Sequence, residues 1–421
     1  MRQPIGVLQN KGVMNNIQET MGLLLNAAIH NKEFTGYAME TDWREIYNIS
    51  MKHQVQALLY PVVKDIAATG GNIDKEVLDD WKKSYAITVI NQSVLLDKVS
   101  DVLNVFRNEG IPIIVLKGLV LRNLYPKPVL RTMGDIDVLV HEEQYDLAVN
   151  AIKRMGYSEY LHDSKHIGLS KHDSLPVEIH TKLSEDYFTA KAMEWEREIW
   201  QRASLSNING IPLLTLSDSD HLLYLCLHMA NHFVTSGFGI RQLCDLVLFI
   251  ESKREQIDWE WFYSNARIMG IQTFIEKIFI LCGIFFHLDD PIFSGYTHDE
   301  QYMQKMIDVI FTGGVFGDSS MASFITGRYL ALLKPEIYDN KKPGSIKRLF
   351  KLIFPPYRII SRSYTYIQKR PYLTPIAWIH RIVANLFGKE KFFRIRDYPA
   401  LIESHYIFEE RYKLLKWTDL I

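Results

Sequence analysis

Two aspartates in an apolar segment are the residues of this chain best suited to chemistry. Asp135 and Asp137 are two positions apart in Gly-Asp-Ile-Asp-Val-Leu-Val, residues 134–140, which otherwise has the composition of a buried strand. Side chains two apart on a strand project from one face, so both carboxylates point the same way. Close carboxylates repel, and both stay ionised only beside a compensating cation. A divalent metal shared with substrate phosphates would supply that charge, which indicates phosphoryl or nucleotidyl transfer.

The neighbouring segments favour this interpretation over a solvated turn or a capped strand end. A predicted strand over 111–116 ends at Lys117-Gly118, and a short apolar helix over 119–125 follows. Glycine at such a turn lets the backbone approach a ligand, and the first amides of a helix are free to bind phosphate. Further along, Glu178 interrupts the apolar strand Val-Glu-Ile-His, with His180 on its face of the strand.

Together these motifs resemble the polymerase-β-like nucleotidyltransferase superfamily and, within it, a bacterial family of uncharacterised nucleotidyltransferases. The resemblance rests on Lys-Gly, an arginine before Gly-Asp-Ile-Asp-Val-Leu-Val, and Val-Glu-Ile-His, and it covers residues 105–185. Weaker similarity extends to His-Gln-Val at 53–55 and to the segment 228–245. One departure is Lys117-Gly118-Leu119, where well-studied members have Gly-Ser or Gly-Gly.

The resemblance implies transfer of a nucleoside monophosphate from a nucleoside triphosphate to an acceptor, by attack on the α-phosphate with loss of pyrophosphate. It implies Mg²⁺ (or Mn²⁺) as cofactor, and a third carboxylate on a neighbouring strand that completes the metal site and serves as base. The catalytic and metal-binding residues would be Asp135, Asp137 and Glu178. The nucleotide-binding residues would be Gly118 and Gly134, with Lys117 and Arg131 as counter-charges.

Other polar residues are candidates for the substrate cleft, each with a simpler structural explanation. His180 lies on the same face of its strand as Glu178, but a core histidine with its hydrogen bonds satisfied would have the same position. His228 and His232 have the i, i+4 spacing of metal ligands on a helix, without a clear third ligand. Arg241 and Asp245 repeat that spacing, which also suits an ion pair within one helix.

We predict an α+β fold with a small mixed β-sheet core and helices, flanked by N-terminal and C-terminal helical regions. Apolar residues spaced three and four apart predict helices over 43–67 and 77–108, and again after 220. The expected division is an N-terminal helical region (1–108), a nucleotidyltransferase core (109–185), a helical domain closing the cleft (186–335) and a basic, aromatic C-terminal segment (336–421).

The net charge of −1 conceals a basic C-terminal segment. Residues 341–396 contain 14 Lys and Arg but one acidic residue, Glu390, and they include eight of the chain's aromatic residues at 357–393. Basic and aromatic residues together suit an anionic membrane or a nucleic acid. The rest of the chain is acidic, so the segment would also suit packing against the protein itself. The sequence leaves these alternatives open.

Composition and cysteine content suggest a cytoplasmic protein. The three cysteines, Cys226, Cys244 and Cys282, lack metal-ligand spacing, and the N-terminus has no apolar signal segment. The nucleoside triphosphate is the expected partner, and the acceptor remains open between a small molecule, a peptide, a protein and an RNA. A non-catalytic nucleotide-binding or protein-interaction module that retains the fold is the alternative function.

Overall fold

The computed structural model describes residues 13–35, 41–162, 166–183, 190–294 and 298–314, and parts of 354–387 and 408–421. The chain divides into two compact units. One combines Met1–Asn231 with Phe238–Val315, and the other combines His232–Gly237 with Phe316–Ile421. All the candidate site residues except His232 belong to the first, larger unit.

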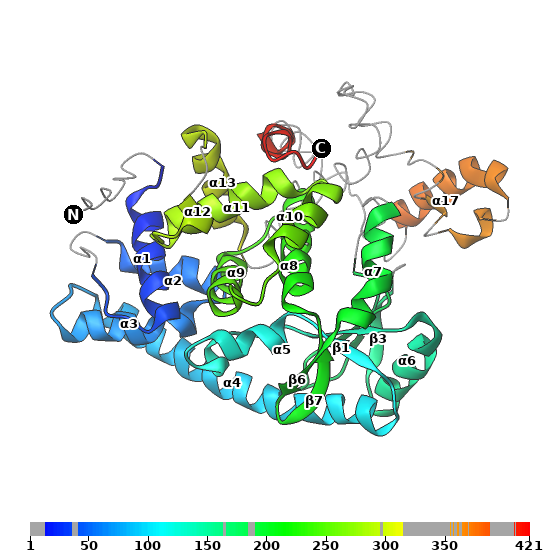
Figure 1. Cartoon of the computed structure of the whole chain (residues 1–421), viewed down its shortest axis with the longest axis horizontal. Helices are drawn as coiled ribbons and strands as arrows, with labels where there is room; N and C mark the ends of the chain where they lie inside the picture. Colours follow the sequence, from blue (N-terminus) through cyan, green and yellow to red (C-terminus); the bar gives the residue numbers. More distant parts are fainter. Residues whose placement is uncertain are drawn as a thin grey trace. The chain divides into compact units, whose positions relative to one another are not determined.

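A seven-stranded mixed sheet forms the centre of the larger unit (Figure 1), as the predicted α+β fold requires. The strand order is β3-β4-β5-β2-β1-β7-β6. Strand β2 pairs with β5, and β1 with β7, in parallel; the other neighbours are antiparallel. The strands are β1 (Ile113–Val115), β2 (Ile136–Val140), β3 (Ser158–His162), β4 (His166–Ser170), β5 (Val177–His180), β6 (Ser204–Ile208) and β7 (Ile211–Thr215).

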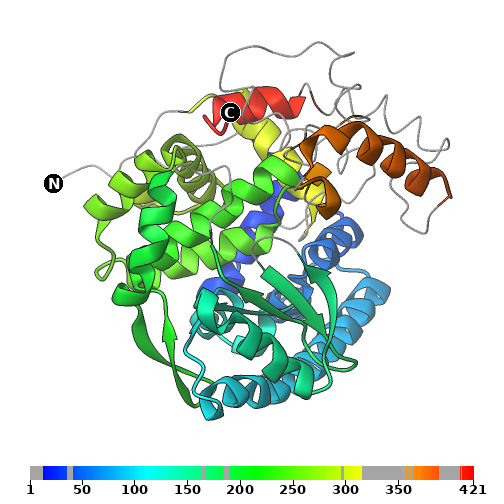
Figure 2. The ribbon, with the colours of Figure 1, turned by 90° about the vertical axis from the view of Figure 1, so that its right-hand side faces the viewer.

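The two faces of the sheet differ in chemistry because side chains alternate along each strand. On one face, Ile136, Val138 and Val140 of β2 and Val177 and Ile179 of β5 are buried in a single apolar core. Two helices, α4 (Lys75–Asn108) and α6 (Tyr145–Arg154), contribute apolar side chains to that core, and α4 runs along the sheet in both ribbon views (Figures 1 and 2). The alternate positions of β2 and β5 carry the polar candidate residues.

Helices before and after the strands complete the larger unit. The four N-terminal helices, α1 to α4, pack together, and α1 also contacts α9 and α11. Short helices connect β1 to β2. The helices of this unit besides α4 and α6 are α1 (Asn16–His30), α2 (Trp43–Lys52), α3 (Gln56–Ala68), α5 (Gly118–Leu121), η1 (Arg122–Leu124), η2 (Pro128–Leu130), η3 (Glu142–Gln144), α7 (Ala190–Arg202), α8 (Asp218–Thr235, which ends in the other unit), α9 (Ile240–Lys253), α10 (Trp259–Ile268), α11 (Gln272–Phe285), α12 (Pro291–Ser294) and α13 (Glu300–Gly313).

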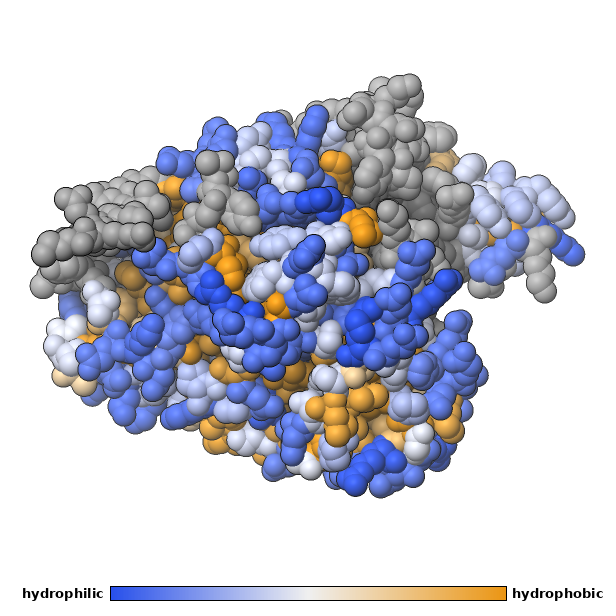
Figure 3. Space-filling view, viewed as in Figure 1, coloured by the Kyte–Doolittle hydropathy of each residue, from blue (hydrophilic) through white to orange (hydrophobic). Residues whose placement is uncertain are grey.

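The sheet includes residues on both sides of the predicted boundary at 185. Strand β7 pairs with β1, so the hairpin β6–β7 extends the sheet with residues 204–215. An apolar patch covers this hairpin in the space-filling view (Figure 3), where Leu205 is exposed. The division into four parts stays a prediction, and the sheet itself extends beyond the segment 109–185.

The smaller unit is described in part. Its described elements include η4 (Thr365–Ile367), η5 (Pro371–Leu373), α17 (Thr374–Phe387) and helical residues at 410–417, with a small apolar cluster of Ile360, Ile367 and Ala377. Much of the basic segment 341–396 lies outside the described residues. Among the helices that are described, none is long and apolar enough to cross a membrane.

Candidate active site

The register of β2 and β5 brings two of the predicted carboxylates together. The parallel pairing sets Asp137 opposite Glu178, and Leu139 opposite His180. Since Val138 and Ile179 point into the apolar core, Asp137, Glu178 and His180 share the opposite face of the sheet. The alternation of apolar and polar residues, read from the sequence, therefore places these three side chains on adjacent strands.

These three side chains form a compact cluster of possible metal ligands. His180 Nε2 lies 2.9 Å from Asp137 Oδ1 and 3.7 Å from Glu178 Oε2. One ligand atom from each residue falls within 4.8 Å of the others, and no other such cluster of three occurs among the described residues. Two carboxylate oxygens and an imidazole nitrogen at this spacing fit the donor set of a divalent cation.

Asp135, just before β2, is electrostatically linked to the cluster. The negative charge of Asp137 raises the pKa of Asp135 to about 7, and burial and Glu178 add to this effect. Burial would also raise the pKa of Asp137, but Lys117 and His180 together lower it below its usual range. The two aspartates therefore differ: Asp137 stays ionised, whereas Asp135 takes up a proton near neutral pH.

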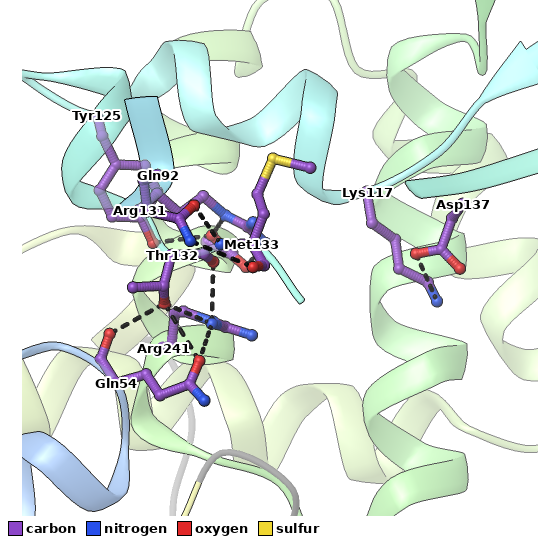
Figure 4. Close-up of polar contacts among 10 residues, drawn as sticks. Gln54, Gln92, Lys117, Tyr125, Arg131, Thr132, Met133, Asp137 and Arg241 are labelled. Atoms are coloured by element: carbon purple, nitrogen blue, oxygen red, sulfur yellow. Dashed lines mark hydrogen bonds and ion pairs between the residues drawn. The ribbon is translucent and has the colours of Figure 1, made fainter. Parts of the chain in front are cut away.

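Lys117 supplies the positive charge nearest to Asp137. Its Nζ is 3.5 Å from Asp137 Oδ2 and 5.4 Å from the centre of the Tyr224 ring on α8 (Figure 4 shows the ion pair). Burial opposes the charge, but Asp137 and Tyr224 raise the pKa of Lys117 above its usual range, so it remains an ammonium. The backbone of Lys117 has φ 40° and ψ −110°, a conformation that residues other than glycine rarely adopt. Such backbone conformations often occur at functional sites.

Arg131 and Asp245 form a buried ion pair next to this site. Arg131 donates from Nε and NH2 to the two oxygens of Asp245, each at 2.7 Å, and Tyr125 donates to the same carboxylate at 2.8 Å. The side chains are 7% and 6% exposed. Asp245 neutralises Arg131 and holds its side chain in position, and the role of Arg131 as a phosphate counter-charge stays a prediction. Asp245 pairs with Arg131 and not with Arg241, so the i, i+4 spacing of Arg241 and Asp245 is not explained by an ion pair within α9.

Arg241 instead holds the loop that leads into the Asp-x-Asp strand. It donates to the carbonyl oxygen of Thr132 at 2.9 Å, to Thr132 Oγ1 at 2.7 Å and to Gln54 Oε1 at 3.0 Å (Figure 4). The next residue, Met133, donates its backbone N–H to Gln92 Oε1 of α4 at 2.9 Å. Side chains from α4, α9 and the turn between α2 and α3 thus fix residues 131–133 and, through them, Asp135.

The remaining predicted residues have different surroundings. Gly118 lies against Arg131, because an added Cβ would be 3.0 Å from Arg131 Nη1, a tight contact that would require the arginine side chain to shift slightly. Gly134 is exposed and has open space where a Cβ would be. His228 and His232 lie on α8 outside the metal-ligand cluster, and His232 belongs to the smaller unit.

Comparison with known proteins assigns the chain to a family. The model of a family described as uncharacterised nucleotidyltransferase matches residues 39–287, more than half of the chain. The chain belongs to this family. The matched range includes the sheet, the Asp-x-Asp strand, Glu178 and the loop contacts from α2–α3 and α9. No curated protein sequence matches the chain.

Solved structures with similarity to this nucleotidyltransferase are distant. The antibiotic-resistance factor ANT(2'')-Ia is 11% identical, with a TM-score of 0.32 over 42% of this chain and 94% of its own. The lincosamide antibiotic adenylyltransferase LnuA, bound to lincomycin, is 14% identical, with a TM-score of 0.27 over 36% and 94%. An antigenic nucleotidyltransferase-like protein from Paracoccidioides brasiliensis is 14% identical, with a TM-score of 0.26 over 38% and 76%.

Several residues around the candidate site were not predicted from the sequence. Tyr160 donates to Glu178 Oε1 at 3.3 Å, and its ring lies over Gly168, where any Cβ would clash. His166 pairs with His180 across β4 and β5, and their rings stack with centroids 5.0 Å apart. The spacing of His162, His166 and His172 carries no signal by itself. The hairpin pairing of β4 with β5 is what brings His166 to the site.

Removing the negative partner of Arg131 should destabilise the protein strongly. Asp245→Asn leaves a buried guanidinium without a counter-charge, and we expect a loss of about 3–5 kcal/mol in the free energy of unfolding. The double variant Arg131→Met with Asp245→Leu removes both charges and should recover most of that loss. Urea unfolding measures both variants. As a control, Glu159→Gln breaks an exposed pair with Lys153 and should cost at most about 1 kcal/mol. A loss no larger for Asp245→Asn than for this control would contradict the positioning role.

Asp135 should make the stability of the metal-free protein depend on pH. Its folded pKa of about 7 is above its ordinary value of 3.8, so the folded state holds the proton more tightly than the unfolded state. Stability from this group is complete below pH 4 and is lost as the pH rises to about 7. Asp135→Asn in chelator should therefore exceed the wild type at pH 8 by about 2–4 kcal/mol, with the difference closing toward pH 4. Denaturation midpoints across this range test the sign; a less stable Asp135→Asn at pH 8 would refute it.

Proposed function

We propose that this protein transfers a nucleoside monophosphate from a nucleoside triphosphate to an acceptor, at the face of the sheet that carries Asp137 and Glu178. The observation that supports this proposal most is the parallel register that sets these two carboxylates side by side, with Asp135 two residues from Asp137. A purely structural protein gains nothing from buried charges that repel, because each is costly to remove from water. Membership of a nucleotidyltransferase family gives the class of reaction.

In this proposal, Asp135, Asp137 and Glu178 hold Mg²⁺ or Mn²⁺. A bound divalent cation would neutralise these carboxylates, activate the acceptor and stabilise charge on the triphosphate. Asp137 is ionised already and fixed by Lys117 and His180, so it is oriented before the substrate binds. Asp135 would release its proton on binding, because a metal ligand must be ionised.

The residues around the carboxylates have separate tasks in the transfer. An acceptor oxygen or nitrogen forms a bond to the α-phosphorus while the bond to the leaving pyrophosphate breaks. Glu178 lies at the less buried end of the cluster, with its side chain 20% exposed, and would accept the acceptor's proton. Lys117, whose ammonium lies 3.5 Å from Asp137, would also attract the phosphates. The backbone at Gly118 would face the triphosphate, which remains a prediction from the resemblance.

Binding and transfer can be tested in sequence. Calorimetry with ATP, GTP, CTP and UTP in Mg²⁺ or Mn²⁺ should detect at least one nucleotide, and pyrophosphate release should follow when cell extract supplies the acceptor. Asp137→Asn and Glu178→Gln should each lower pyrophosphate release by about 100-fold or more, because metal stabilisation contributes several kcal/mol. Glu143→Gln, on the exposed η3, is the matched control and should match the wild type.

The outcome also separates the two candidate functions. Nucleotide binding without pyrophosphate release from any extract would favour a non-catalytic nucleotide-binding module. Absence of binding to all four nucleotides by folded protein would remove the nucleotidyltransferase proposal and favour an interaction module.

A further inference from the structure

The ligand set of this site contains a nitrogen donor that a carboxylate-only magnesium site lacks. His180 Nε2 lies 2.9 Å from an oxygen of Asp137 and 3.7 Å from an oxygen of Glu178. Ligands that share one ion at about 2.1 Å lie about 3.0 Å apart at right angles and about 3.4 Å apart at tetrahedral angles. The two distances from His180 are close to these values, and all three ligand atoms lie within 4.8 Å of one another, so one ion can contact all three once the two carboxylates draw together around it.

The position of His180 is fixed by the sheet and by a second imidazole. It lies in β5 opposite Leu139 of β2 and opposite His166 of β4, and the two imidazole rings stack at an angle of 21°. In the metal-free protein, His180 Nε2 forms a hydrogen bond with Asp137 Oδ1. A bound ion would take the place of that hydrogen, since a ligating imidazole must be neutral and offer its lone pair.

We infer that His180 is a direct ligand and makes this site select a first-row transition ion, such as Mn²⁺, over Mg²⁺. Imidazole nitrogen suits transition metals, whereas Mg²⁺ prefers oxygen ligands and retains its water. This inference rests on the proposed function for its choice of site, and it adds the identity of the ion. His172, whose side chain is 93% exposed, lies outside the ligand cluster and serves as the comparison.

Electron paramagnetic resonance of bound Mn²⁺ tests the inference without any catalytic assay. The wild type should show nitrogen hyperfine coupling to Mn²⁺, and Mn²⁺ should bind at least tenfold more tightly than Mg²⁺ in competition. His180→Gln should lose the coupling and most of this preference, while His172→Gln should keep both. Circular dichroism checks that the variants are folded.

The possible failures are distinguishable. Mn²⁺ bound without nitrogen coupling, coupling that survives in His180→Gln, or equal affinity for Mg²⁺ would overturn the inference and leave the proposed function in place. Absence of any divalent-cation binding, with or without nucleotide, would overturn both.

A second, independent observation concerns helix α17 of the smaller unit. One side of this helix packs inward, with Ala377 fully buried beside Ile360 and Ile367. Another side exposes Tyr372 just before the helix, Ile376 and Ile379, with 73%, 55% and 62% of their surfaces accessible. Ile376 and Ile379 are three residues apart in α17, so they line one face of the helix, and Tyr372 precedes that helix in η5.

We propose that this face of α17 binds an anionic lipid surface. Large apolar side chains exposed together indicate an interaction site, and the surrounding segment 341–396 carries 14 basic residues against one acidic residue. Apolar side chains on a helix within a basic segment suit the membrane interface, where rings and isoleucines enter the lipid and cations meet the headgroups. A nucleic acid would use the charge but would leave the isoleucines in water.

Vesicle cosedimentation of the full chain tests this proposal. The protein should bind vesicles that contain phosphatidylserine at least tenfold better than vesicles of phosphatidylcholine alone, and the binding should weaken as salt rises. Ile376→Ser with Ile379→Ser should reduce binding at least tenfold. The matched control is Ile87→Ser with Ile90→Ser on α4, which are equally exposed (59% and 62%) on a helix with nearly balanced charge.

Three outcomes would overturn the lipid proposal. Absence of binding to either vesicle at low salt would leave the basic segment with a structural role. If the α4 control lost vesicle binding as strongly as the α17 variant, the binding would not depend on the face of α17. RNA binding in a gel shift that is unaffected by Ile376→Ser with Ile379→Ser, together with failure to bind vesicles, would identify a nucleic-acid surface instead.

Discussion

The parallel pairing of β2 with β5 sets Asp137 directly beside Glu178, and the negative charge concentrated here is the constraint around which the site is arranged. Asp135 adds a third negative group. The larger unit meets this constraint in three ways: Lys117 is held in a strained backbone conformation beside Asp137, His180 bonds to the same carboxylate, and Asp135 takes up a proton near neutral pH. A divalent cation would replace this partial compensation, which is why the arrangement is suited to nucleotidyl transfer.

A second network holds the loop before β2 in place. Arg131 and Thr132 are fixed by Asp245 and Arg241 of α9, and Met133 is fixed by Gln92 of α4. His53 joins the same region by accepting the backbone N–H of Ile240, and burial lowers the pKa of His53 to about 4, so its ring is neutral. The helices around the sheet therefore position Asp135 through side chains that are far apart in the sequence, while none of them is a candidate metal ligand.

The sequence anticipated that Asp137 and Glu178 share one face of adjacent strands, but not the side chains that surround them, and the difference has a physical reason. Their role as catalytic residues stays a prediction. Asp137 and Glu178 were recognisable because carboxylates within apolar strands have no ordinary structural explanation, and alternation along a strand fixes the face that they share. The partners of Arg131 and Met133 lie 114 and 41 residues away, and no periodicity relates residues at such distances. The i, i+4 spacing of Arg241 and Asp245 suggested a local ion pair, but buried partners from other elements are better placed.

The central claim is that one divalent cation is shared by Asp137 and Glu178, with Asp135 and His180 at its side. Anomalous diffraction at the manganese edge, from crystals grown with Mn²⁺ and a non-hydrolysable nucleoside triphosphate, tests this claim directly. The account predicts a peak within about 2.0–2.3 Å of both carboxylates, with the triphosphate bound beside Lys117. A well-ordered nucleotide whose metal lies away from Asp137 and Glu178, or a Glu178 side chain directed away from the peak, would contradict it.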